Sequence, residues 1–351
     1  MPSMSFEDLV SPHNWRSFDD HARQIDASLS QDIEIALQQN EIVRTEARAL
    51  LKDQFAVNQC SESDLQEAQN KLFSGQVVAV DGTHSVFEML AGIRCQIGVA
   101  TTTYENKKTV GAVFVSEQQV TAEDTTVLGI LRRRKKSQKV ISRMLVQAVM
   151  FYMERAKALE RGEEWLMFNG ELVPQPLRTG VGSFRALQPC LEMCQRVLER
   201  KKVIGVLGKS TDDELLSLGL ALNAGEYISI RSYREDLDEY VEASGLRGND
   251  RRDMERFNCE WADQFKVGVY RAGGKAYVFQ AHREHFDEAA QLVVRDSMFQ
   301  PLRAYPLLID YADALCSHML SSSDFRRMVE FKLAKAGMLD SEQDEHALRR
   351  R

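Results

Sequence analysis

Residues 76–85 read Gln76-Val77-Val78-Ala79-Val80-Asp81-Gly82-Thr83-His84-Ser85, so that an acidic residue directly follows a run of apolar residues. Four small or β-branched apolar residues in succession are typical of a buried strand, and Asp-Gly before Thr and Ser is typical of the turn that ends it. A carboxylate at that position can bind Mg²⁺ or Mn²⁺, because both cations prefer oxygen ligands. Asp-Gly can equally form an ordinary hairpin turn. The rest of the chain has to separate the two interpretations.

The composition is that of an ordinary globular protein, with 44% apolar residues, 28% charged residues and 7 prolines among 351 residues. This length allows about two domains, or one large α/β domain with insertions. No segment approaches the roughly 20 apolar residues of a membrane helix, and MPSMSFEDLV at the N-terminus lacks the features of a signal peptide. The six cysteines contain no CxxC pair, which argues against a zinc ribbon. We expect a cytoplasmic protein without membrane contact.

One basic run stands out against a net charge of −7. The overall charge argues against non-specific coating of nucleic acid, because clustered Lys and Arg side chains drive phosphate binding. The run itself is either a solvated loop or helix start, or a site that contacts phosphates. Its residues include Arg132, Arg133, Arg134, Lys135 and Lys136.

Residues 1–70 are expected to form a helical arm. Apolar residues such as Ile25, Leu29 and Ile33 fall near helical spacing, and no glycine occurs before Gly75. Such an arm packs either on the body of the protein or on a neighbouring subunit, and both possibilities stay open.

Residues 71–335 have the pattern of one α/β domain. The expected elements, in order, are strands over 77–80, 92–100 and 109–115, a helix over about 138–161, strands over 165–168, 203–207, 265–270 and 275–279, and a helical segment from 286 that is interrupted at Pro301 and Pro306. The first three strands predict an antiparallel meander. A meander, a helix and then strands alternating with helices favour a ribonuclease H-like mixed sheet, in which strand ends bring carboxylates together.

Three further segments need separate interpretations. Gly208-Lys209-Ser210 lacks the earlier glycine of a P-loop, since Val203 holds that place, so we exclude a P-loop. Residues 231–262 are rich in charge and predict a surface insertion. The charged tail over 336–351 is expected to be disordered.

Together these motifs resemble the NurA nuclease family. The residues that carry the resemblance are Val80-Asp81-Gly82-Thr83, Phe168-Asn169-Gly170-Glu171-Leu172, the strand Val203–Leu207 with Lys209, and Tyr305-Pro306 with Ala312-Asp313. The resemblance spans about residues 76–320. It implies a ribonuclease H-like fold, a Mn²⁺-dependent or Mg²⁺-dependent DNA nuclease, and a homodimer docked on a HerA-like hexameric ATPase that translocates DNA.

The same resemblance implies roles for individual residues. Asp81 and Asp313 would be metal ligands, and Tyr305 would lie beside the scissile phosphate. Asn169 stands where the family has a metal-binding Asp, and this lost charge should weaken binding of the cation. Glu171 would face the same side of a continued strand and could compensate.

Other polar residues are weaker candidates for the metal site. Glu154 is the candidate for the family's acidic residue on the preceding helix, although it can equally be a solvated helix carboxylate. For Asp310 a helix-surface role is favoured over a metal role, because the spacing from Tyr305 selects Asp313. His84 is expected to cap the turn after the first strand, with contact to the substrate as the alternative. His282 and His285 are interpreted as surface residues.

The leading hypothesis is therefore a metal-dependent DNA nuclease that works on DNA ends with a HerA-like motor, in DNA repair or in antiviral defence. Several carboxylates would hold Mn²⁺ or Mg²⁺ for phosphodiester hydrolysis. Lys209 and the run Arg132–Lys136 would hold the DNA backbone without reading its sequence. The alternatives are a catalytically decayed DNA-binding or motor-regulating subunit, and a structural α/β protein that shares only the strand-turn spacing.

Overall fold

The computed structural model describes residues 5–12, 15, 17–89, 92–116, 143–179, 186–208 and 213–337. The chain divides into two compact units, Met1–Gln54 and Phe55–Arg351. None of the described helices is both long enough and apolar enough to cross a membrane.

The first unit contains the short helix α1 (Phe6–Val10) and the long helix α2 (Phe18–Gln54). Acidic residues in the first turn of α2 and Lys52 in its last turn favour the helix through its dipole. The expected helical arm is shorter than 1–70, because α2 ends at Gln54. The following strand β1 (Asn58–Gln59) and helix α3 (Glu62–Phe73) belong to the second unit.

The second unit is built on a sheet of nine described strands in the order β1-β7-β8-β9-β6-β5-β2-β3-β4. The remaining strands are β2 (Val77–Met89), β3 (Gly92–Thr102), β4 (Thr109–Ser116), β5 (Trp165–Asn169), β6 (Val203–Leu207), β7 (Glu226–Ser232), β8 (Phe265–Arg271) and β9 (Ala276–His282). Strands β2, β5 and β6 are parallel neighbours, whereas the other pairs are antiparallel. The predicted meander is confirmed as β2-β3-β4.

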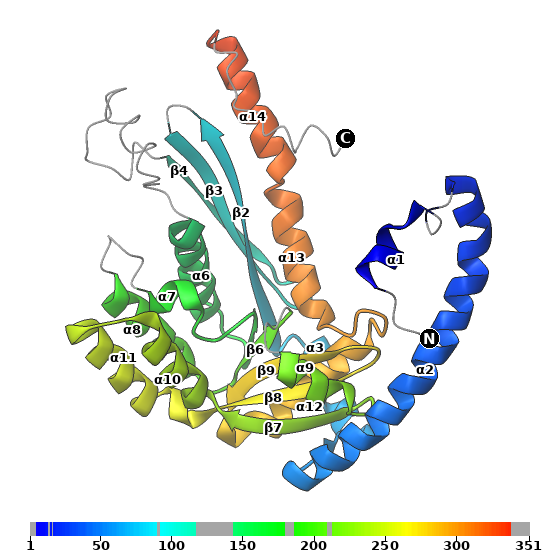
Figure 1. The fold of residues 1–351 in the computed structure, drawn as a ribbon. Coiled ribbons are helices and arrows are strands. Elements are labelled where there is room, and N and C mark those ends of the chain that lie inside the picture. The colour runs from blue at the N-terminus through cyan, green and yellow to red at the C-terminus, as the bar shows by residue number, and fades with distance from the viewer. Residues whose placement is uncertain are drawn as a thin grey trace. The chain divides into compact units, whose positions relative to one another are not determined.

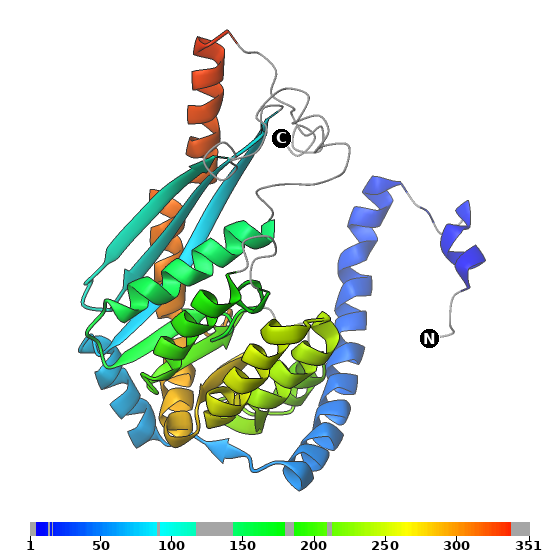
Figure 2. The same cartoon turned by 90° about the vertical axis from the view of Figure 1, so that its left-hand side faces the viewer.

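Helices cover both faces of this sheet. Helix α6 (Arg143–Leu159) and helix α13 (Leu307–Met319) both contact β2 and β3, from opposite faces (Figure 1). Figure 2 looks onto the α6 side, with α13 and α14 behind the strands. The other described α-helices are α7 (Gln175–Arg178), α8 (Leu187–Leu198), α9 (Asp213–Leu220), α10 (Tyr233–Ser244), α11 (Gly248–Glu260), α12 (Phe286–Met298) and α14 (Ser322–Lys335).

The main core forms because the central strands are apolar on both faces. Val77, Ala79, Met167 and Ile204 are fully buried and pack with side chains of α3, α12 and α13. Alternate residues of the same strands, such as Val78, are also fully buried. Such continuous apolar runs are typical of parallel strands that are covered on both sides.

The first strand differs from its prediction in one important respect. We expected a turn at Asp81-Gly82, but β2 continues to Met89 because β3 pairs with it from Ala79 opposite Thr102 onward. The parallel pairing of β2 with β5 ends much earlier, at Val80 opposite Phe168. Asp81 therefore lies within a strand, at the point where its parallel neighbour stops.

The charged segment 231–262 forms two helices, α10 and α11, which contact each other between β7 and β8. Strand β7 was not predicted. It pairs with β8 through an irregular register between Ser229 and Arg231. A half-buried strand with such a shift has no clean period of two, and its sequence pattern is correspondingly weak. The charged tail lies outside the described residues from residue 338 onward.

Candidate active site

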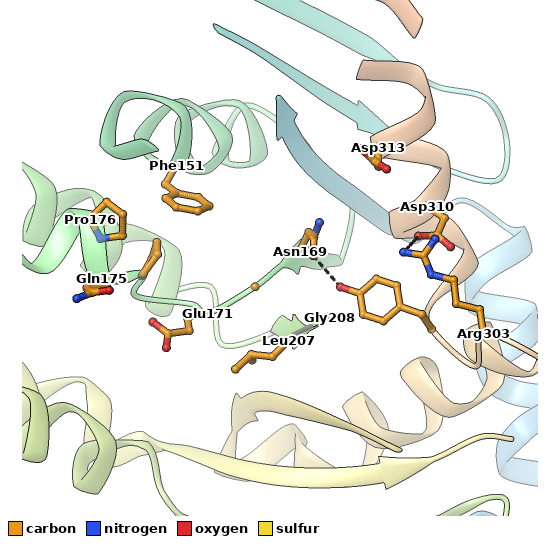
Figure 3. Close-up of a pocket in the computed structure, with 13 residues that line it drawn as sticks. Phe151, Asn169, Glu171, Gln175, Pro176, Leu207, Gly208, Arg303, Asp310 and Asp313 are labelled. Atoms are coloured by element: carbon orange, nitrogen blue, oxygen red, sulfur yellow. Dashed lines mark hydrogen bonds and ion pairs between the residues drawn. The ribbon is translucent and has the colours of Figure 1, made fainter. Parts of the chain in front are cut away.

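A cleft of about 470 Å³ opens where β5 and β6 end (Figure 3). Carboxyl ends of parallel strands are the usual place for a site in an α/β sheet, because the strands stop and loops diverge there. The lining residues are Phe151, Asn169, Gly170, Glu171, Pro174, Gln175, Pro176, Leu207, Gly208, Arg303, Tyr305, Asp310 and Asp313. The cleft thus gathers polar side chains from β5, α13 and the intervening loops.

Asp81, Asn169 and Tyr305 are linked by hydrogen bonds across three elements. The Nδ2 atom of Asn169 donates to Oδ1 of Asp81 over 3.0 Å. The hydroxyl of Tyr305 lies 2.8 Å from Oδ1 of Asn169 and 3.0 Å from the carbonyl oxygen of Val206. Both Asp81 and Tyr305 are buried. Tyr305 therefore fixes the Asn169 amide in the orientation that donates to Asp81.

Glu154 extends from α6 toward the same point of β2. Its side chain is 1% exposed, and its Oε2 accepts a hydrogen bond of 3.1 Å from Nη1 of Arg155. Its Oε1 is buried and has no hydrogen-bond partner. A Cβ atom on Gly82 would lie only 2.6 Å from this Oε1, so the carboxylate packs directly against the β2 backbone beside Asp81. The interpretation of Glu154 as a solvated helix carboxylate is wrong.

Burial controls the protonation of these two carboxyl groups. It raises the pKa of Asp81 to about 7, with a hydrogen bond from Asn169 acting in the opposite direction and the charge of Asp313 adding to the rise. Burial also raises the pKa of Glu154 to about 8, partly offset by Arg155 and reinforced by Asp81. Two nearby carboxylates in a poorly solvated place each disfavour the other's charge, and a bound cation would remove this penalty.

The two acidic residues of α13 have different surroundings. Asp310 forms an ion pair of 3.1 Å with Arg303 and accepts a hydrogen bond of 2.7 Å from Nε2 of Gln300. Asp313 is exposed and accepts a hydrogen bond of 3.2 Å from the hydroxyl of Ser317, and its charge acts on Asp81. Asp313 is therefore the α13 carboxylate that is available at the Asp81 end of the cleft.

Glu171 does not lie where we expected it. Strand β5 ends at Asn169, and Gly170 turns the chain with a φ of 105°, a value that side chains disfavour. The Glu171 carboxylate points away from Asn169 (Figure 3) and pairs with Nη2 of Arg178 over 2.6 Å. The continued strand on which its predicted compensating role depended is therefore absent at this position.

The structure also changes the interpretation of His84, His282 and His285. His84 pairs with Ile97 inside β2, so there is no turn for it to cap. His282 is 2% exposed, and its Nδ1 accepts a hydrogen bond from the backbone N–H of Glu284. His285 is partly buried and stacks edge-on against Trp165. The prediction that His282 lies on the surface is wrong, because the end of β9 is covered by Phe265.

The predicted DNA-binding residues Lys209, Arg132, Arg133, Arg134, Lys135 and Lys136 lie outside the described residues. The structure adds two cleft residues that the sequence analysis missed, Arg303 and Phe151, and the buried Arg155 that pairs with Glu154. Arg155 follows Glu154, and Arg303 precedes the Tyr305-Pro306 motif by two residues. Proximity to those motifs is the only sequence signal that could have indicated them.

The donor set suits a hard divalent cation. Within the described part of the chain, no group of three or more His, Cys, Asp or Glu side chains is already arranged to hold a metal ion. The contacts give the reason, since Asn169 occupies one oxygen of Asp81 and Arg155 occupies one oxygen of Glu154. The unpartnered Oε1 of Glu154 and the carboxylates of Asp81 and Asp313 are nevertheless the oxygen ligands that Mn²⁺ and Mg²⁺ prefer.

Comparison with solved structures identifies the fold. The NurA nuclease from Sulfolobus solfataricus aligns over 90% of this chain and 98% of its own, with 11% identity and a TM-score of 0.50. The chain has the NurA fold. A NurA structure with manganese aligns over 88% of this chain and 98% of its own, with 10% identity and a TM-score of 0.47. Endonuclease V from Bacillus subtilis covers 75% of this chain and 92% of its own, with 12% identity and a TM-score of 0.34.

No protein-family model and no curated protein sequence matches the chain. The fold match confirms the expected ribonuclease H-like mixed sheet with flanking helices. At 11% identity it shows the fold alone, so the roles of individual residues depend on the geometry of the cleft.

Proposed function

We propose that this protein is a metal-dependent DNA nuclease that hydrolyses phosphodiester bonds at DNA ends. One observation carries the proposal. The buried carboxylates of Asp81 from β2 and Glu154 from α6 lie close enough for the charge of one to act on the other, and the exposed Asp313 of α13 acts on Asp81 from the cleft, beside Asn169 and Tyr305. Buried carboxylates that converge without enough counter-charge are typical of a site for divalent cations.

In this proposal, Asp81, Glu154 and Asp313 hold Mn²⁺ or Mg²⁺. When bound, such a cation polarises the phosphate and lowers the pKa of a bound water molecule. The chain itself orients the ligands. Asn169 and Tyr305 hold Asp81, whereas Arg155 holds one oxygen of Glu154 and leaves the other unpartnered.

Positive charge for the DNA backbone would come from two sources. Arg303 lies at the edge of the cleft with its side chain 57% exposed, paired to Asp310 and placed over the ring of Tyr305. Lys209 and the run Arg132–Lys136 remain proposed phosphate contacts. Such contacts position a backbone without reading its sequence, which fits a nuclease without sequence preference.

The proposal includes a HerA-like hexameric ATPase as partner and a homodimer as the working form. Its support is the resemblance in motifs to the NurA family, together with the NurA fold. Co-purification of the protein with such an ATPase, and light scattering of the protein alone, test these two parts separately. An intact monomer that neither binds the ATPase nor changes its DNA-stimulated turnover would contradict both.

The nuclease activity itself is tested with linear DNA and Mn²⁺. We expect Asp81→Ala and Asp313→Ala each to lower the rate on the order of 100-fold or more, because each removes a ligand of the cation. Asp324→Ala on α14, at an exposed position paired only loosely with Arg327, serves as the control and should keep full activity. Full activity in both site variants would overturn the proposal.

A second candidate function is supported by one specific contact. The Asn169 amide donates directly to Asp81, so a neutral hydrogen-bond donor stands beside Asp81 where a metal-binding carboxylate was expected. A catalytically decayed DNA-binding or motor-regulating subunit would have this property. Activity that appears only in Asn169→Asp would favour the decayed subunit over the nuclease.

A further inference from the structure

Arg155 is buried to the same extent as the carboxylate beside it, with its side chain 1% exposed. Adjacent residues of a helix do not normally face each other. Here both side chains turn into the interior, and Nη1 of Arg155 donates to Oε2 of Glu154 over 3.1 Å. The same Nη1 also donates to the carbonyl oxygen of Phe151 over 3.0 Å. The guanidinium is thus fixed on its own helix and fixes the carboxylate in turn.

The other side of the guanidinium holds the loop after β5. Nη2 of Arg155 donates to the carbonyl oxygen of Glu171 over 2.6 Å, and Nε donates to that of Leu172 over 3.3 Å. The backbone N–H of Leu172 is held in addition by Oε1 of Gln280 over 2.9 Å. One side chain therefore joins α6 to the loop that follows Asn169 and lines the cleft.

Two aromatic rings enclose this guanidinium. Its central carbon lies 5.1 Å from the ring centroid of Phe168 and 5.6 Å from that of Phe151. Rings at this distance attract the cation and exclude water from its faces. Because a planar guanidinium has several donors in fixed directions, its hydrogen bonds set the directions of all its acceptors at once.

We propose that Arg155 is a positioning residue of the metal site, which aims the unpartnered Oε1 of Glu154 at the cation and holds the loop that follows Asn169 at the end of β5. The inference rests on the proposed function, because it assigns Glu154 to the cation. It goes further in naming a residue that never touches the cation or the DNA and yet sets the affinity for the cation. Partners of metal ligands commonly change metal affinity 10-fold to 100-fold when they are replaced.

The test is Mn²⁺ binding measured by isothermal titration calorimetry on the full chain. Arg155→Lys keeps the charge but cannot reach Glu154 and two carbonyl oxygens together. We expect its Kd for Mn²⁺ to rise about 10-fold or more, with the circular dichroism spectrum unchanged. The loss of DNA cleavage should be larger at low Mn²⁺ than at saturating Mn²⁺, which a purely structural role would not produce.

Arg200→Lys is the matched control. Arg200 also donates to two backbone carbonyl oxygens, those of Glu163 and Arg161, and is not among the residues that line the cleft. Its Kd for Mn²⁺ should stay within about twofold of the wild-type value. If Arg155→Lys does not fold, Arg155→Gln replaces it in the same measurement, because its amide still reaches a single carbonyl oxygen.

The outcomes separate the inference from the proposed function. A wild-type protein that binds Mn²⁺ and cuts DNA, together with an unchanged Kd in the folded Arg155 variant, would overturn the inference alone. A wild-type protein that neither binds Mn²⁺ nor cuts DNA would overturn both. A raised Kd in the Arg155 variant with an unchanged Kd in Arg200→Lys supports the inference.

Discussion

At the scale of single residues, Asn169 links Asp81 to Tyr305. Its amide donates to Asp81, and its carbonyl oxygen lies 2.8 Å from the Tyr305 hydroxyl. A carboxylate at this position would accept from Tyr305 but would repel Asp81. The neutral residue therefore stabilises Asp81 by a hydrogen bond, whereas a carboxylate there would need a cation to offset the repulsion.

Asn169→Asp is expected to lower the free energy of unfolding in EDTA by about 1–3 kcal/mol, since a buried hydrogen bond is lost and like charges meet. Saturating Mn²⁺ should restore most of this loss, because a carboxylate binds the cation more strongly than an amide does. Urea denaturation with EDTA and with Mn²⁺ measures both effects. Equal stabilisation of wild type and variant by Mn²⁺ would contradict the expectation.

Asn258 offers a matched control for this substitution. It is fully buried, and its Nδ2 donates to Oδ1 of Asp238 over 2.8 Å, away from the cleft. Asn258→Asp creates the same kind of acidic pair and should also destabilise the protein. Mn²⁺ should not reverse its effect, since none of the three proposed ligands is involved.

At the scale of elements, the site depends on the close approach of α6 to β2. A Cβ atom on Gly82 would lie 2.6 Å from Oε1 of Glu154 and 2.6 Å from Cγ of Met150. Both partners are buried, so neither can move away freely. The Glu154 carboxylate can lie next to Asp81 because Gly82, the strand residue that it packs against, has no side chain.

Gly82→Ala is therefore expected to lower the free energy of unfolding by about 1–3 kcal/mol through overpacking, and to reduce nuclease activity by displacing Glu154. Gly111→Ala on β4 is the control, since its Cβ would meet only Cε of Lys157 at 3.6 Å. That variant should stay within about 1 kcal/mol of wild type. Thermal denaturation measures the stability of both variants. Equal melting temperatures for Gly82→Ala and Gly111→Ala would refute the packing argument.

At the scale of the whole molecule, Asp296 joins three parts of the second unit. This residue of α12 is fully buried, accepts a hydrogen bond from the hydroxyl of Tyr104 after β3, and accepts another of 3.0 Å from the backbone N–H of Leu308 in α13. The second bond satisfies an otherwise free N–H in the first turn of α13. It thereby fixes the helix that carries Asp313.

Burial raises the pKa of Asp296 to about 7, so the native protein binds one proton that the unfolded chain releases above its ordinary pKa near 3.8. Its contribution to stability is fully present below pH 3.8 and is lost as the pH rises through about 7. The free energy of unfolding should therefore fall toward neutral pH, by at most about 1.4 kcal/mol per pH unit for this group.

Asp296→Asn should flatten this dependence, which urea denaturation between pH 5 and pH 8 measures. Asp324→Asn at the exposed start of α14 should leave the slope unchanged. A slope in Asp296→Asn equal to that of wild type would show that another group controls the pH dependence.

Part of the fold and site follows from the sequence alone. The apolar runs 77–80, 165–168 and 203–207 predict strands because residues buried on both faces must all be apolar. The breaks at Pro301 and Pro306 predict where the C-terminal helices end and begin, since proline cannot continue a helix. The resemblance to the NurA family favours Asp313 over Asp310 as a candidate ligand, and in the structure Asp310 is held by Arg303 and Gln300.

The remainder depends on contacts between residues far apart in the chain. Asp81-Gly82 has the local signature of a turn, yet 11 paired positions with β3 keep it in a strand. Glu171 has the spacing of a strand residue, but the chain turns at Gly170 and its carboxylate pairs with Arg178. Neither outcome is encoded locally, because each is set by a partner from elsewhere in the chain.

The sequence by itself determined which residues carry acidic and apolar chemistry, and therefore the class of sheet and the candidate ligands Asp81 and Asp313. Only the tertiary structure decided that Glu154 reaches the same point buried, that Arg155 holds it, and that Asn169 donates to Asp81. The physical reason is that burial and hydrogen-bond partners, which set charge state and direction, arise only when β2, β5, α6 and α13 pack together. Residues 76–85 specify a carboxylate, and the packing around it makes a site.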